Sequence, residues 1–377
     1  MGDVAGILGP NKDMVEAQGV KTPTSSISFY PRKIGPFLLA AGLLLLAALP
    51  CFPDIPCVFT GVDKVVAVGD LHGDYQNFIK ILTGTILVDQ DLHWIAGRTH
   101  LVQTGDILDR GPSARKIFDL LIQLEKEAEQ AGGHVHVLTG NHEEMAIAGI
   151  SHQYSGYVTA EQFQSFLPDD YVDKRQNEYR DKKMAGLPAG AEPPAIPLPE
   201  LRQYWQKILE DDEKARDIYY DSLHKEYGAW LIGHNAVIKI NDTVFAHGGI
   251  SERFSTMPLE DINRDLRQEL ELAMRGAQFR PRIMYAPNGP LWYRGLALSD
   301  EKSMAPEVDR ILGNLKARHM VIAHTPRGFG TFRTMERFEG KIWVIDTGIS
   351  EYYGGHYSAL IIKDRNFKPW GVINGAK

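Results

Sequence analysis

Polar side chains that can bind metal ions follow short apolar stretches at five places along this sequence. Each apolar stretch is typical of a buried strand, and each polar group lies in the turn directly after it. The groups are Asp70 with His72, Asp106 with Asp109 and Arg110, Asn141 with His142, His247, and His324. Carboxylate and amide oxygens and imidazole nitrogens suit Mn, Fe or Zn. The five turns together therefore predict a centre that holds divalent metal ions.

Two ions held side by side need an anionic ligand between them, because like charges about 3.5–4 Å apart repel each other. Asp106, in the middle one of the first three turns, is the candidate for this bridge. We assign one ion to Asp70, His72 and Asp106, and the other to Asp106, Asn141, His247 and His324. The remaining histidines, among them His100, His134 and His136, follow no such turn, and we expect them to be structural.

Such a centre predicts hydrolysis of phosphate esters. A water shared by two cations has a lowered pKa and can attack phosphorus directly, while the ions polarise the phosphoryl oxygens. His142 would give the leaving oxygen its proton, and Asp109 would keep that imidazole charged. The predicted phosphate-binding residues are Arg110, Asn141 and Arg294. The two arginines are included because a guanidinium can pair with two phosphate oxygens at once.

The spacing of the first three turns indicates the elements that must position them. Asp70, Asp106 and Asn141 follow one another at intervals of 36 and 35 residues. These intervals suit consecutive parallel strands joined by crossover helices, so that the turns meet at one edge of an α/β sheet. Later in the chain, residues 341–346 and 357–362 alternate between apolar and polar types, and we predict that both are strands of a second sheet.

The motifs in these turns resemble the signature of the phosphoprotein phosphatase branch of the calcineurin-like metallophosphoesterases. Those motifs are residues 69–73, 105–111, 140–143 and 247–249. Within that branch, residues 228–231, 240–250, 292–294 and 345–350 are similar to the Shewanella-like protein phosphatases. The resemblance covers about residues 62–370. It implies an α/β fold, a four-layer α/β/β/α sandwich with a two-metal site at the strand ends, and it supports the roles assigned above.

The predicted function is that of a metal-dependent protein phosphatase, acting on a phosphoprotein or a small phosphomonoester and on Ser/Thr or Tyr phosphate. One alternative is a nucleotide or dinucleoside polyphosphate hydrolase on the same scaffold. Another is a non-enzymatic scaffold of this fold, which the retention of every ligand disfavours. A net charge of −7 argues against broad nucleic-acid binding. Nothing in the sequence indicates an oligomeric state.

Residues 54–377 are predicted to form the catalytic domain, with an insertion at about 152–232. The chain between the third and fourth motifs is too long for a simple connection, and part of it is rich in proline. We expect the insertion to lie outside the core as a partly helical cap beside the site. Helices are expected at 200–210 and 213–227, and the proline-rich part should act as a semi-rigid linker.

The N-terminus predicts a membrane anchor. Residues 1–33 are polar and aperiodic, as in a flexible tail. Residues 34–53 contain no charge and are long enough to span a bilayer once as an uncleaved signal anchor, with a cleaved signal peptide as the alternative. Arg32 and Lys33 precede this segment, so the positive-inside rule puts the catalytic domain on the lumenal or extracytoplasmic side.

Overall fold

The computed structural model describes residues 55–185, 188, 192, 195–327 and 335–371. The predicted tail at 1–33 and the predicted anchor at 34–53 lie outside the described residues, as do residues 186–187, 189–191 and 193–194 of the proline-rich part of the insertion. Among the helices within the described ranges, none is both long and apolar enough to cross a membrane.

The first three turns follow three parallel strands of a five-stranded sheet. Strands β2 (Lys64–Val68), β3 (His100–Gln103) and β4 (His134–Val137) pair in parallel, in the strand order β11-β10-β2-β3-β4. The connections between them are α2 (Tyr75–Gly84) and α3 (Ala114–Gln130). The last four residues of β2 are all apolar and buried, as expected of a parallel strand that is covered on both faces. The prediction of consecutive parallel strands with crossover helices is therefore confirmed.

A six-stranded mixed sheet packs against the first. Its order is β1-β5-β6-β7-β9-β8. The strands are β1 (Val58–Phe59), β5 (Val237–Ile240), β6 (Thr243–Ala246), β7 (His319–Ile322), β8 (Glu336–Arg337) and β9 (Ile342–Val344). β6, β7 and β9 run parallel to one another, so that the turns carrying His247 and His324 emerge at one edge of this sheet.

One of the two late strands joins a different sheet from the one predicted. β9 lies in the second sheet, but β10 (Ser358–Lys363) pairs antiparallel with β2 in the first, with Leu360 opposite Ala67. β11 (Asn366–Gly371) then pairs with β10 at the edge. Alternation of apolar and polar residues shows that one face of a strand is buried. It cannot say which sheet the strand joins, because both sheets bury a face in the same core.

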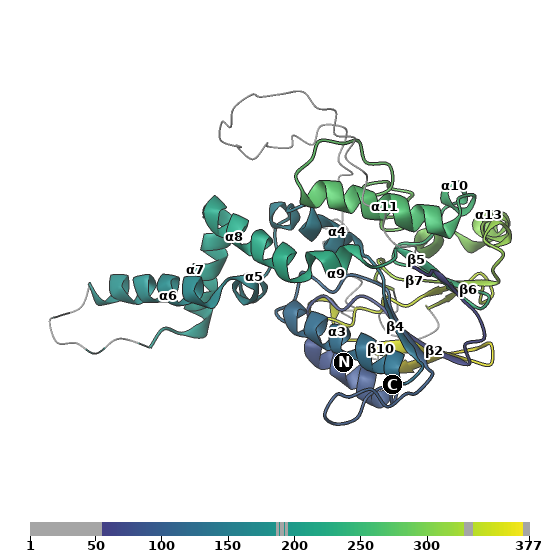
Figure 1. Ribbon diagram of the computed structural model, residues 1–377, viewed down its shortest axis with the longest axis horizontal. Helices are drawn as coiled ribbons and strands as arrows, with labels where there is room; N and C mark the ends of the chain where they lie inside the picture. The colour runs from purple at the N-terminus through teal and green to yellow at the C-terminus, as the bar shows by residue number, and fades with distance from the viewer. Residues whose placement is uncertain (1–54, 186–187, 189–191, 193–194, 328–334, 372–377) are drawn as a thin grey trace, which may run out of the picture. The chain divides into compact units, whose positions relative to one another are not determined.

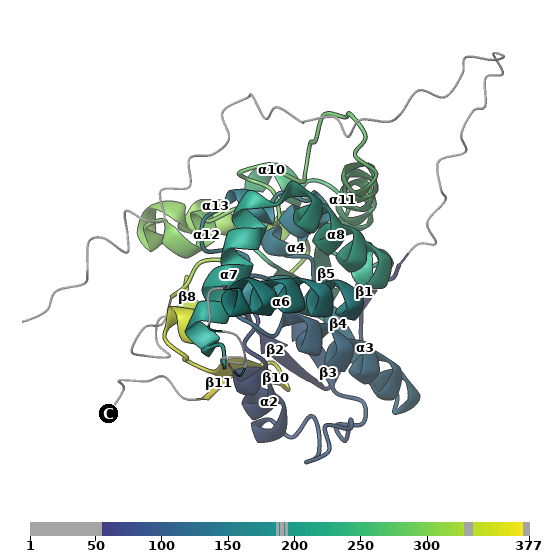
Figure 2. The same ribbon diagram turned by 90° about the vertical axis from the view of Figure 1, so that its left-hand side faces the viewer.

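Helices cover the outer faces of the two sheets (Figure 1). α2 and α3 lie on the five-stranded sheet, and the opposite side carries α10 (Glu252–Ser255), α11 (Leu259–Met274), α12 (Gly295–Leu298) and α13 (Glu301–Asn314), as the turned view in Figure 2 also shows. One continuous hydrophobic core joins the layers. The predicted α/β fold with two packed sheets is confirmed.

The described part of the segment between β4 and β5 is mostly helical. It contains α4 (Asn141–Ile147), η1 (Ser151–Gln153), α5 (Ala160–Phe166), α6 (Asp169–Met184), α7 (Leu198–Asp211), α8 (Glu213–Leu223), the π-helical turn η2 (His224–Gly228) and α9 (Ala229–Ile232). The predicted helices at 200–210 and 213–227 are confirmed. The expectation that this segment stays out of the core is wrong, since Phe163, Trp205 and Tyr219 are almost completely buried in it. The length of the segment suggested a cap, but its aromatic residues need a buried partner.

Candidate metal centre

The first two turns of the five-stranded sheet are tied together through their backbones. The carbonyl oxygen of Asp106 accepts hydrogen bonds from the backbone N–H groups of Leu71 and His72, at 3.0 and 2.9 Å. The N–H of Thr104 donates to the carbonyl of Val68 at 3.0 Å. The turns that follow β2 and β3 are therefore one interlocked unit rather than two independent loops.

Several residues of the five predicted turns have strained backbones. The residues there with positive φ other than glycine are His72, Asp106, Asp109, Arg110 and His324, with φ between 43° and 68°. L-residues rarely adopt this conformation, and each such residue costs on the order of 1–3 kcal/mol. Every one of the five is a residue to which the sequence assigned a role. Strain of this kind gathers at functional sites, because the surrounding structure fixes side chains there in one orientation.

Two glycines allow the second and third turns to come into contact. A Cβ atom on Gly105 would lie 2.5 Å from the backbone nitrogen of Gly140. A Cβ atom on Gly140 would lie 2.3 Å from Oδ1 of Asp106. Both distances are shorter than atoms can approach without bonding. The glycine that begins each motif is therefore required by the close approach of the two turns.

Glu143 holds the Asp106 turn from behind. Its carboxylate accepts hydrogen bonds from the backbone N–H groups of Asp106, Ile107, Leu108 and Gly140, at 2.8, 2.9, 3.1 and 3.0 Å. The side chain is buried. Sequence reasoning gave this residue no role. The available signal was its place three residues after Gly140 at the start of α4, where Glu commonly caps a helix.

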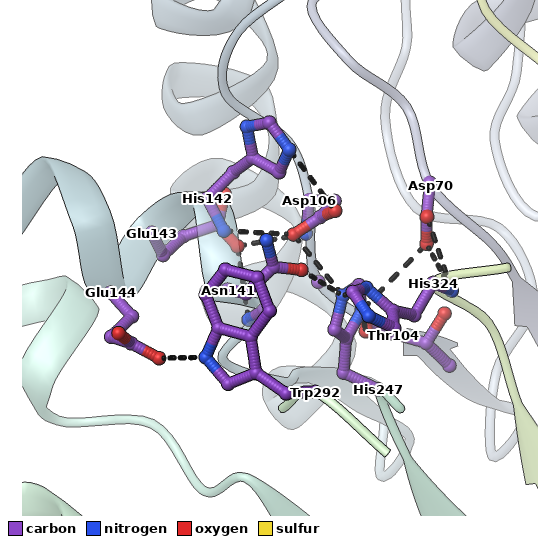
Figure 3. A network of polar contacts seen from close by, with 12 residues as sticks. Asp70, Thr104, Asp106, Asn141, His142, Glu143, Glu144, His247, Trp292 and His324 are labelled. Carbon is purple, nitrogen blue, oxygen red and sulfur yellow. Dashed lines mark hydrogen bonds and ion pairs between the residues drawn. The ribbon is translucent and has the colours of Figure 1, made fainter. Parts of the chain in front are cut away.

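The six predicted metal ligands lie together in one buried cluster. Figure 3 shows the side chains of Asp106, Asn141 and His247 pointing toward one another. Nε2 of His247 lies 2.9 Å from Oδ1 of Asn141, 3.2 Å from Nδ1 of His324 and 3.3 Å from Oδ1 of Asp106. Asp70 accepts the backbone N–H of His324 at 3.2 Å. The turns of both sheets thus converge on Asp106.

Two of the histidines are hydrogen-bonded through Nδ1 to backbone carbonyls, which turns Nε2 of each ring toward the cluster. Nδ1 of His72 donates to the carbonyl of Leu108 at 3.0 Å, and Nδ1 of His247 donates to the carbonyl of Thr104 at 2.8 Å. A ring held through Nδ1 in this way turns its Nε2 toward the cluster, which is the arrangement that metal-binding histidines need. In His247 this nitrogen faces the oxygens of Asn141 and Asp106. A cation is what such converging acceptors can bind.

Two overlapping groups of side chains fit metal ions. His72, Asp106 and His142 offer potential ligand atoms within 4.8 Å of one another, and so do Asp106, His247 and His324. Asp106 belongs to both groups. Nε2 of His324 is buried and has no hydrogen-bond partner among the described residues. The donor set therefore fits two ions that share Asp106.

The pKa values of two carboxylates in the cluster, Asp106 and Asp70, are shifted in opposite directions. Burial alone would raise the pKa of Asp106, but the neighbouring His247 and His142 hold it well below its usual range. Burial raises the pKa of Asp70 well above its usual range, and the carboxylates of Asp346 and Asp106 add to that effect. A concentration of buried carboxylates is the environment that divalent cations neutralise.

His142 makes a separate pair with Asp109 beside the cluster. Nδ1 of His142 lies 2.7 Å from Oδ2 of Asp109, and Nε2 lies 3.8 Å from Oδ2 of Asp106. Burial lowers the pKa of His142, but Asp106 and Asp109 outweigh it and raise the pKa overall. The ring therefore carries a proton readily on the side that faces the cluster.

The two predicted phosphate-binding arginines lie next to the cluster. Arg110 follows Asp109 directly, and one of its terminal nitrogens donates to the hydroxyl of Tyr352 at 3.1 Å. Its Nε is buried and has no hydrogen-bond partner among the described residues. Arg294 precedes α12 and donates from its Nη1 to the carbonyl of His324 at 2.8 Å and to Oγ1 of Thr325 at 3.1 Å. Both guanidinium groups are thus held near ligand-bearing turns.

Comparison with known proteins agrees with this geometry. The family profile of the calcineurin-like phosphoesterases matches residues 63–328. The chain belongs to this family. An uncharacterised protein of Schizosaccharomyces pombe is 30% identical to this phosphoesterase over 309 residues, which cover 80% of this chain and 78% of that protein.

The phosphoesterase is also similar to named phosphatases. Shewanella-like protein phosphatase 2 of Arabidopsis thaliana is 28% identical, with 72% of this chain and 68% of that one covered. Shewanella-like protein phosphatase 1 of Plasmodium berghei is 26% identical, with 82% and 74% covered. Among solved structures, the cold-active protein-tyrosine phosphatase of a psychrophilic Shewanella species matches with a TM-score of 0.57 and 25% identity, covering 85% of this chain and 81% of that one. The protein is a phosphatase enzyme of this family.

Proposed function

We propose that this phosphoesterase is a protein phosphatase that hydrolyses phosphomonoesters with two divalent ions, Mn, Fe or Zn. The observation that carries the proposal is the His142–Asp109 pair, 2.7 Å apart, beside a cluster of converging metal-binding atoms centred on Asp106. Hydrolysis of a phosphomonoester needs both parts, a site that activates water and an acid that protonates the leaving oxygen. The similarity to named protein phosphatases supports the same conclusion.

One ion would be held by Asp70, His72 and Asp106, and the other by Asp106, Asn141, His247 and His324. When bound, the ions would supply water of lowered pKa as the nucleophile and would polarise the phosphoryl oxygens. The arrangement around Asp106 supports this division, since the two turns that contribute to the first set and the four turns that contribute to the second already meet there.

The protein's own side chains would do the remaining work. Arg110, Arg294 and Asn141 would orient the phosphate oxygens opposite the nucleophile. His142 would pass the proton on Nε2 to the leaving oxygen as its bond to phosphorus breaks, and Asp109 would stabilise the ring in its protonated form. His142 is 5% exposed and Asp109 is fully buried, so the acid works in a site from which bulk water is largely excluded.

Aromatic residues at the site favour phosphotyrosine within this class of substrates. The guanidinium carbon of Arg110 lies 4.0 Å from the centre of the Tyr157 ring and 4.8 Å from that of Tyr352. The ring of Tyr353 lies 5.3 Å from that of His72. Tyr352 is 57% exposed and so offers a face to an incoming ring. An aryl phosphate could stack on these rings, whereas a serine phosphate has no ring to place there.

The deciding experiment is turnover of a substrate panel with added Mn. The panel contains matched phosphotyrosine, phosphoserine and phosphothreonine peptides, free nucleotides and diadenosine tetraphosphate. We expect the phosphotyrosine peptide to be hydrolysed with the highest kcat/KM. Preferential cleavage of diadenosine tetraphosphate or of nucleotides would overturn the proposal in favour of a nucleotide hydrolase on the same scaffold.

We further propose that residues 34–53 anchor the enzyme in a membrane as a single-pass segment, with the catalytic part on the lumenal or extracytoplasmic side. The support is the uncharged length of this segment and the two basic residues before it. A cleaved signal peptide remains the alternative.

A further inference from the structure

Asp109 is held on two sides by a single side chain, that of Gln162 in α5. Oε1 of Gln162 accepts the backbone N–H of Asp109 at 2.7 Å. Nε2 of Gln162 donates to Oδ1 of Asp109 at 2.9 Å and to the hydroxyl of Tyr219 at 3.0 Å. Both ends of the amide are used, so its orientation is fixed by its partners. Gln162 is completely buried.

This contact determines how Asp109 meets His142. Oδ1 of Asp109 binds Gln162, and Oδ2 is thereby directed at Nδ1 of His142, 2.7 Å away. Asp109 also has a positive φ of 68°, a conformation that is uncommon for residues other than glycine. Without Gln162 the carboxylate of Asp109 would lose one hydrogen bond and its backbone N–H would lose another, so the turn would lose part of what holds its strained backbone.

Tyr157 supports both Arg110 and His142. Its carbonyl accepts the backbone N–H of Arg110 at 2.7 Å, and its ring lies under the guanidinium. The same ring stacks on the imidazole of His142, with centroids 4.6 Å apart and planes inclined by 28°. Tyr154 also stacks on Tyr157, with ring centroids 5.0 Å apart. One aromatic ring therefore sets the positions of both the proposed acid and the proposed phosphate clamp.

Both supporting residues come from the predicted insertion, and neither belongs to a motif of the five turns. We propose that Gln162 and Tyr157 are positioning residues for catalysis: they hold the Asp109–His142 pair and Arg110 in their working geometry. The insertion then completes the leaving-group side of the active site. This inference rests on the proposed phosphatase function.

Gln162→Met tests the proposed role of Gln162, because methionine fills a similar volume but makes no hydrogen bonds to Asp109. The measurements are kcat and KM on p-nitrophenyl phosphate, whose leaving group needs little protonation, and on a phosphoserine peptide, whose leaving group needs much. We expect kcat on the peptide to fall roughly 10- to 100-fold, as is typical when a residue that supports a functional side chain is replaced. On the aryl ester we expect kcat to fall about 3-fold or less. KM and a metal content of two ions per chain should not change.

Tyr157 is tested by a pair of variants. Tyr157→Phe keeps the ring and the backbone carbonyl, so we expect its changes in kcat and KM to be much smaller than those of Tyr157→Leu. Tyr157→Leu removes the face on which Arg110 and His142 rest. It should raise KM for both esters about 10-fold, since Arg110 is less well placed, and should lower kcat further on the peptide than on the aryl ester.

Two more variants complete the design. Tyr219→Phe removes only the hydroxyl that Gln162 also binds, and we expect a milder form of the Gln162→Met pattern. Gln206→Met is the matched control, because Gln206 lies on α7 and donates to Glu210 on the exposed surface. It should leave both esters unaffected.

The outcomes separate the inference from the function on which it rests. If the wild type hydrolyses neither ester, the proposed function is wrong. If the wild type is active and Gln162→Met is folded, holds metal and keeps the wild-type ratio of activities on the two esters, the positioning role is overturned. Should Gln162→Met fail to fold or to hold metal, Tyr219→Phe decides: an unchanged ratio in that variant also overturns it.

Discussion

The carboxylate of Glu143 accepts the backbone N–H of Asp106 at 2.8 Å, so the proposed bridging residue is supported from behind by a second buried carboxylate. Three further backbone N–H groups of the two turns donate to the same carboxylate. In Glu143→Gln an amide group would face these donors and leave at least one of them unpaired. We expect the free energy of unfolding to fall by about 1–3 kcal/mol for each donor left unpaired.

Urea denaturation of Glu143→Gln at matched metal content measures this loss. Glu144→Gln is the neighbouring control, because Glu144 accepts from Nε1 of Trp292 at 2.8 Å, a bond that an amide oxygen can also accept. Equal stability of Glu143→Gln and the wild type would show that the Asp106 turn does not depend on Glu143.

Asp106→Asn should abolish both turnover and metal occupancy. An amide can still fill the position, but it carries no negative charge to hold two cations close together. Elemental analysis of the purified variant gives the metal content, and activity is measured with excess Mn. If the variant retains two ions per chain and wild-type turnover, the assignment of Asp106 as the bridge is wrong.

His142→Asn should separate catalysis from metal binding. The backbone N–H of His142, which donates to Oδ1 of Asp106 at 3.0 Å, remains in the variant, so both ions should stay bound. Loss of the acid should lower kcat about 10²–10⁴-fold on alkyl phosphates and much less on activated aryl phosphates. An equal loss on esters of high and low leaving-group pKa would remove His142 from the acid role.

The residues of the metal cluster could be predicted because each follows a buried strand within a short motif. Asp70, Asp106 and Asn141 lie where their spacing in parallel strands requires, at one edge of the five-stranded sheet. His247 and His324 follow strands of the second sheet, and the packing of the two sheets brings them to the same place. Local pattern and strand direction are sufficient for these positions.

The supporting residues could not be predicted in this way. Gln162 contacts Asp109 across 53 residues of sequence, and Tyr157 meets Arg110 through a loop that has no motif. Their roles depend on how the insertion packs, which hydrophobic periodicity does not specify. The sequence pattern also could not predict which sheet β10 joins, because its partner β2 lies almost 300 residues earlier. Long-range pairing is decided by the whole core rather than by local sequence.

The anchor at residues 34–53 is tested by fractionation of cells that express the full chain. An uncleaved signal anchor should keep the protein in the membrane fraction after a carbonate wash. Protease treatment of sealed microsomes should leave residues 54–377 intact until detergent is added. Digestion without detergent would place the catalytic domain in the cytoplasm, and release by carbonate would favour a cleaved signal peptide.

The last prediction concerns three histidines far from the proposed active site. His100, His134 and His136 lie on the same face of β3 and β4, and Nδ1 of His100 lies 2.9 Å from Nε2 of His136. The ring of Phe59 packs against them, 4.5 Å from that of His136. Burial, with a contribution from His134, lowers the pKa of His100 to about 4, and burial lowers the pKa of His136 well below its usual range.

Stability should therefore decrease in acid. Other charged groups act on His134, where Glu125 and Glu129 raise its pKa and His234 lowers it, but burial is the larger effect and the net shift is downward. Below about pH 6.5 the histidines of the unfolded chain take up protons that these folded residues do not. The free energy of unfolding should then fall as the pH drops from about 6.5 toward 4. Above about pH 6.5 these three histidines should not change the free energy of unfolding with pH.

His100→Gln should make this fall shallower, because one of the suppressed protonations is removed. His93→Gln is the contrasting control: the hydrogen bond that His93 donates to the Glu127 carboxylate raises the pKa of this exposed histidine, so its contribution to stability is present in acid and is lost as the pH rises. His93→Gln should therefore make the free energy of unfolding fall more steeply as the pH drops. Urea denaturation of the three proteins between pH 4.5 and 7.5, at equal metal content, measures the slopes, and identical slopes for His100→Gln and the wild type would show that the cluster does not control acid stability.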